Sequence, residues 1–399
     1  MKKLSIIALV VAFAAAFAHT ASANEWKLYG SARMATFWTS QDYGDLNKSS
    51  TNPIGDDVFG RSSVRNLQWK LQGNSRIGTT VEGDMLDGRF EFGVNDDPTG
   101  GGTVTARRVY GMWKFTEGWG LKVGKDYTPI TFLLSNQVFD NDNYLRLVGN
   151  AYGARKGQVE LAGKGFKFAA ITPSPTALDN LAGTVADATT ESKLPKFEAS
   201  YQFNFTDAMS VHAFGGWQYY NLFWLNPNSG AKQEKNVTSY MFGVGADLNF
   251  GPFFVKPQVS YYTNGAVAGW LNTNLGLNSS LPQQTPFINA TGNGIVDIKS
   301  LMAMLAVGFT PNESLGLEAG VGYLKSDSDD YRLADGQSVN FKNTYLEYSL
   351  QAVITMAKGV YLIPEVGFRD YGELEGNPAE PNQDLGSLFY AGAKWQIDF

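Results

Sequence analysis

The carboxyl-terminal stretch, residues 386–399, constrains the fold of this chain most, and it reads GSLFYAGAKWQIDF. Side chains of a β-strand alternate between two faces. One face would therefore carry only apolar residues, namely Phe389, Ala391, Ala393, Trp395, Ile397 and Phe399. A soluble sandwich could place such a strand at an edge, but chain termini of soluble domains tend to fray. An amphipathic strand that ends on an aromatic residue is typical of one that closes a barrel in lipid.

The amino-terminal end predicts export. Lys2 and Lys3 precede an apolar run over residues 4–18, and Ala21-Ser22-Ala23 follows. This order of a basic region, a short apolar region and a small-residue cleavage site is that of a secretory signal peptide. We expect residues 1–23 to be removed, so that the mature chain begins at Asn24. A retained membrane anchor is the alternative, but the apolar run is shorter than a spanning helix needs.

Composition narrows the class of protein. No other stretch is continuously apolar over the roughly 20 residues of a spanning helix, so a membrane protein of this sequence must be a barrel. The chain has no cysteine, and a closed hydrogen-bond ladder can stabilise an exported protein that has no disulfide. The net charge of −6 disfavours nucleic acid as a partner, since that role requires a clustered basic surface.

The pattern of turns and loops predicts the number of strands. Seven tight connections rich in turn-forming residues lie between alternating runs, at 83–88, 117–118, 163–165, 206–208, 251–252, 310–314 and 357–359. Eight longer loops alternate with them, near 39–61, 95–104, 127–153, 173–194, 221–236, 264–296, 325–340 and 371–385. We therefore predict one all-β domain over 24–399, a transmembrane antiparallel β-barrel of sixteen strands. Its short turns would be periplasmic and its long loops extracellular.

Residues 106–129, ARRVYGMWKFTEGWGLKVGKDYTP, resemble the fourth and fifth strands of the Gram-negative general porins, and residues 74–78 resemble the second strand of that family. The resemblance implies a homotrimer in the outer membrane, in contact with lipid and lipopolysaccharide. It also implies recognition of the carboxyl-terminal strand, ending in Phe399, by the barrel-assembly machinery. It further implies that the third loop, about 127–153, folds into the lumen.

In the porin family, acidic residues of that loop face a basic patch on the wall, and the resemblance carries this arrangement to residues of matching position. The loop candidates are Asp140, Asp142 and Arg146. The wall candidates are Arg33, Arg76, Arg108 and Lys122 by strand parity, with Lys125 near the loop entry. Opposed charges beside a narrow aqueous path orient dipolar solutes and bias ion passage. Asparagines at 136, 141 and 143 stand where more acidic charge is expected, which weakens any preference for cations.

Three further features have simpler interpretations. The aromatic run at 220–224 is expected to belong to an interfacial girdle, with a sugar-stacking surface as the alternative. The acidic run 326–331 lacks calcium-loop spacing and is expected to be a solvated loop. Outside the predicted signal, His212 is the only histidine, and no serine signature accompanies it.

The sequence thus predicts a passive channel for small hydrophilic solutes and ions, with no catalysis, cofactor or metal. A substrate-selective porin with a lumenal site is the first alternative. A barrel hydrolase that uses His212 is the second.

Overall fold

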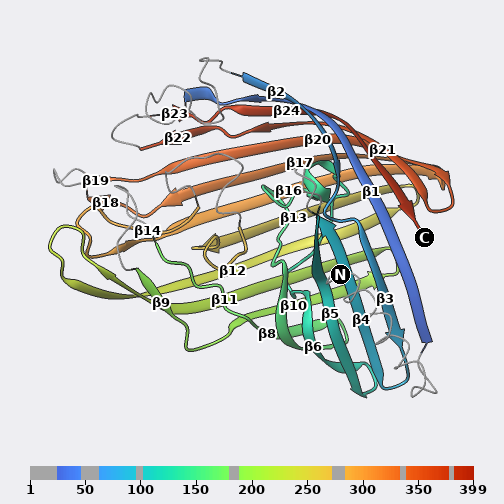
Figure 1. The fold of residues 1–399 in the computed structure, drawn as a ribbon, viewed down its shortest axis with the longest axis horizontal. Helices are drawn as coiled ribbons and strands as arrows, with labels where there is room; N and C mark the ends of the chain where they lie inside the picture. Colours follow the sequence, from blue (N-terminus) through green and yellow to red (C-terminus); the bar gives the residue numbers. More distant parts are fainter. Residues whose placement is uncertain are drawn as a thin grey trace, which may run out of the picture.

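The computed structural model describes residues 25–45, 63–95, 102–178, 188–271, 284–332, 338–376 and 382–399. The predicted signal peptide, 1–23, lies outside these residues, as does Asn24. The described residues form a closed barrel (Figure 1). Its long elements are β1 (Glu25–Asp42), β2 (Ser63–Leu71), β3 (Arg76–Glu82), β4 (Leu86–Asn95), β5 (Thr103–Thr116), β6 (Trp119–Tyr127), β7 (Arg155–Gly163), β8 (Phe166–Ile171), β10 (Lys196–Thr206), β11 (Met209–Leu225), β12 (Lys232–Phe250), β13 (Phe253–Thr263), β16 (Ile298–Asn312), β17 (Leu315–Ser328), β20 (Lys342–Ala357), β21 (Val360–Asp370) and β24 (Ser387–Asp398).

Short elements extend or connect these strands. They are β9 (Thr189–Glu191), β14 (Phe287–Ile288), β15 (Ile295–Val296), β18 (Tyr331–Arg332), β19 (Ser338–Val339), β22 (Glu373–Glu375), β23 (Gln383–Asp384) and the one-turn helix α2 (Phe139–Asp142). None of the described helices is long and apolar enough to cross a membrane.

The strands pair in antiparallel order around the ring, which confirms the predicted sixteen-stranded barrel. β2 and β3 both pair with β1 and form one barrel strand that is interrupted at 72–75. The ring closes where β24 pairs with β1, from Ser31 opposite Asp398 to Asp42 opposite Ser387. On its other side β24 pairs with β21. The carboxyl-terminal strand therefore closes the barrel, as the sequence predicts (Figure 1).

All seven predicted tight connections separate neighbouring strands of the barrel. One predicted loop, 221–236, is wrong in its extent, because β11 runs on to Leu225 and β12 begins at Lys232. The true turn is built around Asn226, whose side-chain oxygen accepts hydrogen bonds from the backbone of Asn228 and Ser229. Aromatic residues favour extended backbone, so the aromatic run continues the strand and the turn forms at the Asn-Pro-Asn sequence after it.

The two faces of the wall differ as a membrane barrel requires. On β10 and β12 the outward residues Phe203, Phe205 and Phe242 are exposed to the surroundings of the barrel. The inward residues of these and later strands are polar and buried: Glu198, Ser200, Ser239, Glu318, Glu347, Gln351, Glu365 and Lys394. An apolar outer belt and a polar interior are the pattern expected of a barrel in lipid.

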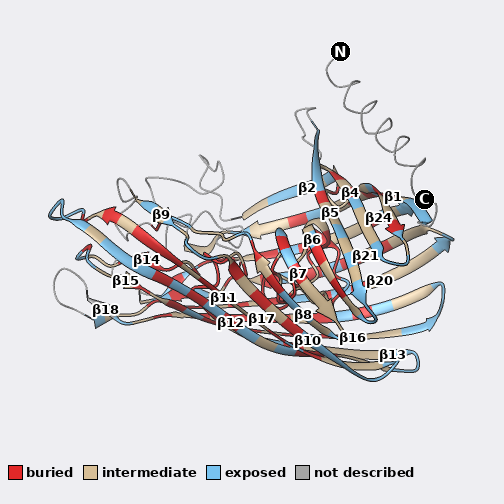
Figure 2. Cartoon of the chain, turned by 90° about the horizontal axis from the view of Figure 1, so that it is seen from below, coloured by how far each residue is buried: buried red, intermediate tan, exposed pale blue. Residues whose placement is uncertain are grey.

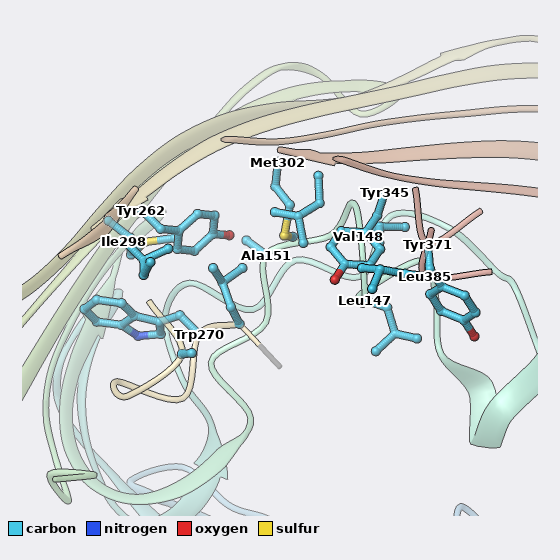
Figure 3. Packing of buried hydrophobic residues seen from close by; sticks show 14 of the residues in the cluster. Leu147, Val148, Ala151, Tyr262, Trp270, Ile298, Met302, Tyr345, Tyr371 and Leu385 are labelled. Carbon is cyan, nitrogen blue, oxygen red and sulfur yellow. The ribbon is translucent and has the colours of Figure 1, made fainter. Parts of the chain in front are cut away.

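The interior is partly filled by chain rather than open throughout. Buried residues gather inside the ring of strands (Figure 2). Much of the buried apolar cluster consists of loop residues packed on the inner wall. Figure 3 shows Leu147, Val148 and Ala151 of the β6–β7 connection close to Met302 of β16 and Tyr345 of β20. These loop residues therefore occupy part of the space inside the barrel.

Candidate functional site

The connection between β6 and β7, residues 128–154, is here called the inner segment because it lies against the inward face of the wall. Two wall glutamates bind its first half. Glu318 of β17 accepts hydrogen bonds from the backbone and side-chain nitrogens of Asn136, at 2.8 and 2.6 Å. Glu365 of β21 accepts a hydrogen bond from the Val138 nitrogen at 2.5 Å. These hydrogen bonds hold the first half of the inner segment on the wall.

The apex of the inner segment is held by an ion-pair cluster around Asp142. The Asp142 carboxylate pairs with the Arg33 guanidinium of β1 and, at 2.8 Å, with the Lys394 ammonium of β24. Its side chain is fully buried, and those of Arg33 and Lys394 are each 6% exposed. Two cations therefore neutralise this carboxylate within the protein.

Asp140 lies toward a different part of the wall. Its carboxylate is 3.5 Å from the guanidinium of Arg369 on β21. Arg369 also donates to Glu347 of β20 at 2.9 Å. Asp140, Asn141 and Asp142 all have positive φ, so the chain makes a left-handed turn at this point. That turn points the two aspartates to different partners.

A second inner segment, residues 264–271 with 284–297, fills the interior along β10 to β13. The Trp270 indole donates to Glu198 at 2.8 Å, and the Lys196 ammonium donates to the Ala268 carbonyl at 3.0 Å. The aromatic run at 220–224 packs beneath this segment: Tyr220 and Trp224 are 0% and 2% exposed. The expected interfacial girdle is therefore wrong for these two residues, because strand parity turns them inward where a loop covers them. The same burial removes them as a sugar-stacking surface.

A cavity of about 340 Å³ remains on the other side of the interior. We call it the basic cavity. It lies between the inner segment and the wall formed by β5, β6 and the start of β7. Its lining consists of Gly73, Asn74, Thr105, Ala106, Arg107, Lys125, Tyr127, Leu133, Asn141, Asp142, Tyr144, Arg146, Tyr152, Ala154 and Arg155.

A β-bulge increases the positive charge at this wall. Opposite β4, the register passes from Arg108 to Ala106, which leaves Arg107 as the extra residue of β5. A bulge reverses the side-chain alternation locally and can redirect a side chain. Both Arg107 and Arg108 therefore reach the interior. Arg107 donates to Glu91 at 2.8 Å and to the Asn74 side chain at 2.5 Å.

Several wall cations have carboxylate partners. Arg108 and Lys122 pair with Asp126, at 2.6 and 2.9 Å, and Lys122 also pairs with Glu160 at 2.9 Å. Glu91 forms ion pairs with three arginines. Guanidinium nitrogens of Arg76, Arg89 and Arg107 lie 3.9, 3.2 and 2.8 Å from its carboxylate oxygens. The Glu91 cluster therefore keeps an excess of positive charge.

Three cations that line the basic cavity have no carboxylate partner among the described residues. Lys125 donates to the Ala106 carbonyl at 2.7 Å, and Arg155 donates to the Tyr127 hydroxyl at 3.0 Å. The Arg146 guanidinium lies 4.8 Å from the centre of the Tyr152 ring. Its Nε atom is buried without a hydrogen-bond partner.

Tyr144 adds a neutral donor to the same cavity. Burial, together with the nearby Asp142 carboxylate, raises the pKa of Tyr144 to about 12. A tyrosine hydroxyl with a pKa of 10 or above is protonated at neutral pH. This one can therefore donate a hydrogen bond into the cavity without adding negative charge.

The structure thus divides the predicted site residues. Arg146 and Lys125 line the basic cavity, and Arg33 binds Asp142 at the edge of this cavity. Arg108 and Lys122 lie inside the barrel but form ion pairs with Asp126. Arg76 lies near Glu91, and Asp140 lies near Arg369. Loop acids do face wall bases: Asp142 is in direct contact with Arg33 and Lys394, and Asp140 lies beside Arg369. Residues that the sequence did not single out are Arg107, Arg155 and Lys394. Strand parity could have found Lys394, but no local signal reveals the bulge at Arg107.

The remaining motifs have structural partners. His212 is 2% exposed and stacks on Phe132 of the inner segment, with ring centres 3.8 Å apart. In the acidic run 326–331, Asp327 and Asp329 lie 3.5 and 2.5 Å from lysine ammonium groups. No group of potential metal ligands occurs among the described residues.

A sixteen-stranded antiparallel barrel with a polar interior and an apolar belt defines the class of the fold, which is that of the Gram-negative outer-membrane porins. Solved structures agree. The outer membrane channel DcaP of Acinetobacter baumannii superposes with a TM-score of 0.61 at 15% identity, over 95% of this chain and 99% of that chain.

Two further solved structures share the fold. An anion-selective porin from Comamonas acidovorans gives a TM-score of 0.53 at 15% identity, over 94% of this chain and 100% of that one. OmpT, an outer membrane protein of Vibrio cholerae in its trimer form, gives a TM-score of 0.52 at 15% identity, over 94% of this chain and 100% of that one. No protein-family model matches the sequence, and no curated protein sequence matches it.

Proposed function

We propose that the chain is an outer-membrane porin through which small hydrophilic solutes and ions diffuse passively. The observation that carries this proposal is the basic cavity, a polar space of about 340 Å³ left between the inner segment and the wall. The inner segment forms the constriction in this proposal, because its anchors are wall side chains of β1, β17, β21 and β24. Known porin folds of similar architecture support it.

The proposed channel should conduct in a planar lipid bilayer. We expect stepwise insertions with a conductance that rises nearly in proportion to salt concentration, because a water-filled path needs no tight ion site. Liposome swelling should slow steeply from mono- to trisaccharides, since the cavity is small. A purified, correctly folded barrel that gave no conductance steps would contradict the proposal. A swelling rate that saturated for one sugar would favour the substrate-selective alternative.

The hydrolase alternative depends on His212, and its surroundings argue against it. General base catalysis requires a nucleophile or water within hydrogen-bond reach of the imidazole. The described neighbours of the ring are Phe132, Phe214 and the Gln258 amide, whose nitrogen is 3.3 Å from Nε2. We therefore propose that His212 packs the inner segment on the wall and that the chain is not an enzyme.

We also propose that the protein is exported to the outer membrane and assembles there as a homotrimer, in contact with lipid and lipopolysaccharide. Outer-membrane extracts in mild detergent should contain an oligomer that heat dissociates to the monomer. Its mature amino terminus should be Asn24. Intact-mass spectrometry that found Lys2 and Lys3 retained would contradict export by cleavage. Light scattering that gave a monomer in several gentle detergents would contradict the trimer.

A further inference from the structure

We propose that the basic cavity is a binding site for small solutes that carry a carboxylate or phosphate group. This inference rests on the proposed channel function and assigns a solute class to the same path. Among the described residues that line the cavity, Asp142 is the only one with a carboxylate. Arg33 and Lys394 already form ion pairs with that carboxylate. The cations Lys125, Arg146 and Arg155 have no such partner there. The cavity therefore attracts negative charge.

The donors of Arg146 are the strongest indication that a ligand belongs here. A buried donor without a partner is costly, because its hydration is lost and nothing replaces it. The Nε atom of Arg146 is in this position, while its side chain lines the cavity. The planar guanidinium fork matches the two oxygens of a carboxylate or phosphate. The buried Nε is out of reach of a solute, so an oxyanion in the cavity would accept hydrogen bonds from the terminal nitrogens of this guanidinium.

Two tyrosines hold the arginines in place. Arg146 lies over Tyr152 and Arg155 over Tyr127, at 4.8 and 5.1 Å from the ring centres. The two rings also contact each other edge to face, with centres 6.4 Å apart. Such cation–π contacts fix a guanidinium before the solute arrives and reduce the entropy lost on binding. The site is therefore preorganised and not a set of mobile surface charges.

The volume of the cavity restricts the solute. About 340 Å³ is at the small end of the range of ligand pockets in proteins. It can hold a small organic acid or a phosphate compound with a short carbon skeleton. Because a diffusion path must also release its solute, we expect weak and rapidly reversible binding.

Single-channel recording in potassium chloride tests the site, with citrate and pyrophosphate as anionic probes and sucrose as the neutral control. We expect either anionic probe to reduce the current in a saturable way. Sucrose at the same concentration should cause no saturable reduction. In the Arg146→Gln/Arg155→Gln variant, the half-blocking concentration should rise about tenfold. The anion-to-cation permeability ratio should fall about fourfold for each charge removed, the factor that Coulomb's law in water gives at about 5 Å.

Two further variants separate a binding site from a general field. Arg146→Lys keeps the charge but loses the fork, so the permeability ratio should stay and the block should weaken. Lys235→Gln removes an exposed charge on β12 and should change neither quantity. If the double variant conducted normally and the anionic probes blocked it as strongly as the unaltered protein, the binding site would be overturned but not the channel function. Absence of any conductance in the unaltered protein would instead overturn the channel function on which it rests.

Discussion

Replacing Asp142 with asparagine should move the zero-current potential across a salt gradient further toward anions. The change removes the one charge that neutralises Arg33 and Lys394, both of which are buried. A unit charge about 5 Å from a passing ion in water contributes nearly 1 kcal/mol, which corresponds to about a fourfold change in relative permeability. Loss of one partner from a buried ion pair also costs about 3–5 kcal/mol. We therefore expect a less firmly held inner segment and noisier open-channel current.

Two control variants show whether the expected shift in zero-current potential depends on the buried position of Asp142 or follows from the loss of any negative charge. Asp140→Asn should have a weaker effect, because its side chain is 45% exposed and lies 3.5 Å from Arg369. Neutralising Asp327, Asp329 and Asp330 together should have little effect, since charges in an outer loop are screened within a Debye length of about 10 Å. The shifts should be largest at low salt. Equal shifts in all three variants would show that the inner segment is not the selective element.

Deleting Phe399 should sharply reduce the amount of folded barrel. The backbone of Phe399 exchanges two hydrogen bonds with Gly30 of β1, at 2.6 and 3.0 Å. Its ring covers Gly30 so closely that a Cβ atom there would lie 2.4 Å from the ring. The two hydrogen bonds together contribute about 1–3 kcal/mol, so the ratio of folded to unfolded protein near the urea midpoint should fall roughly tenfold. Heat-shifted electrophoresis of refolded protein measures this ratio.

Truncation and a matched aromatic variant complete the test of closure. Removing residues 387–399 takes β24 from both β1 and β21, which leaves two unpaired edges, and this should abolish insertion. Phe205→Ala removes an aromatic side chain of similar exposure from β10 and should leave insertion largely intact. If it impaired folding as much as deletion of Phe399, the terminal residue would have no special part in closing the barrel.

The sequence by itself determined the wall of the barrel. Alternation along β24, β20 and β21 identifies the face that meets lipid, because side chains of a strand alternate whatever the strand pairs with. Glycine, asparagine and proline mark the turns for an equally local reason, since they adopt turn conformations at little cost. Inward placement of Arg33, His212, Glu347 and Arg369 follows from the same parity, and the structure agrees.

Only the tertiary structure decided the electrostatics of the interior. The bulge that turns Arg107 inward arises from the pairing of β5 with β4. Asp142 is neutralised by residues 109 and 252 positions away in the chain, and Val138 binds a glutamate 227 positions away. No local pattern encodes such contacts. They form because a segment carried into the interior must satisfy its polar groups with whichever wall side chains face it there, and this selection leaves Lys125, Arg146 and Arg155 beside the cavity without carboxylate partners.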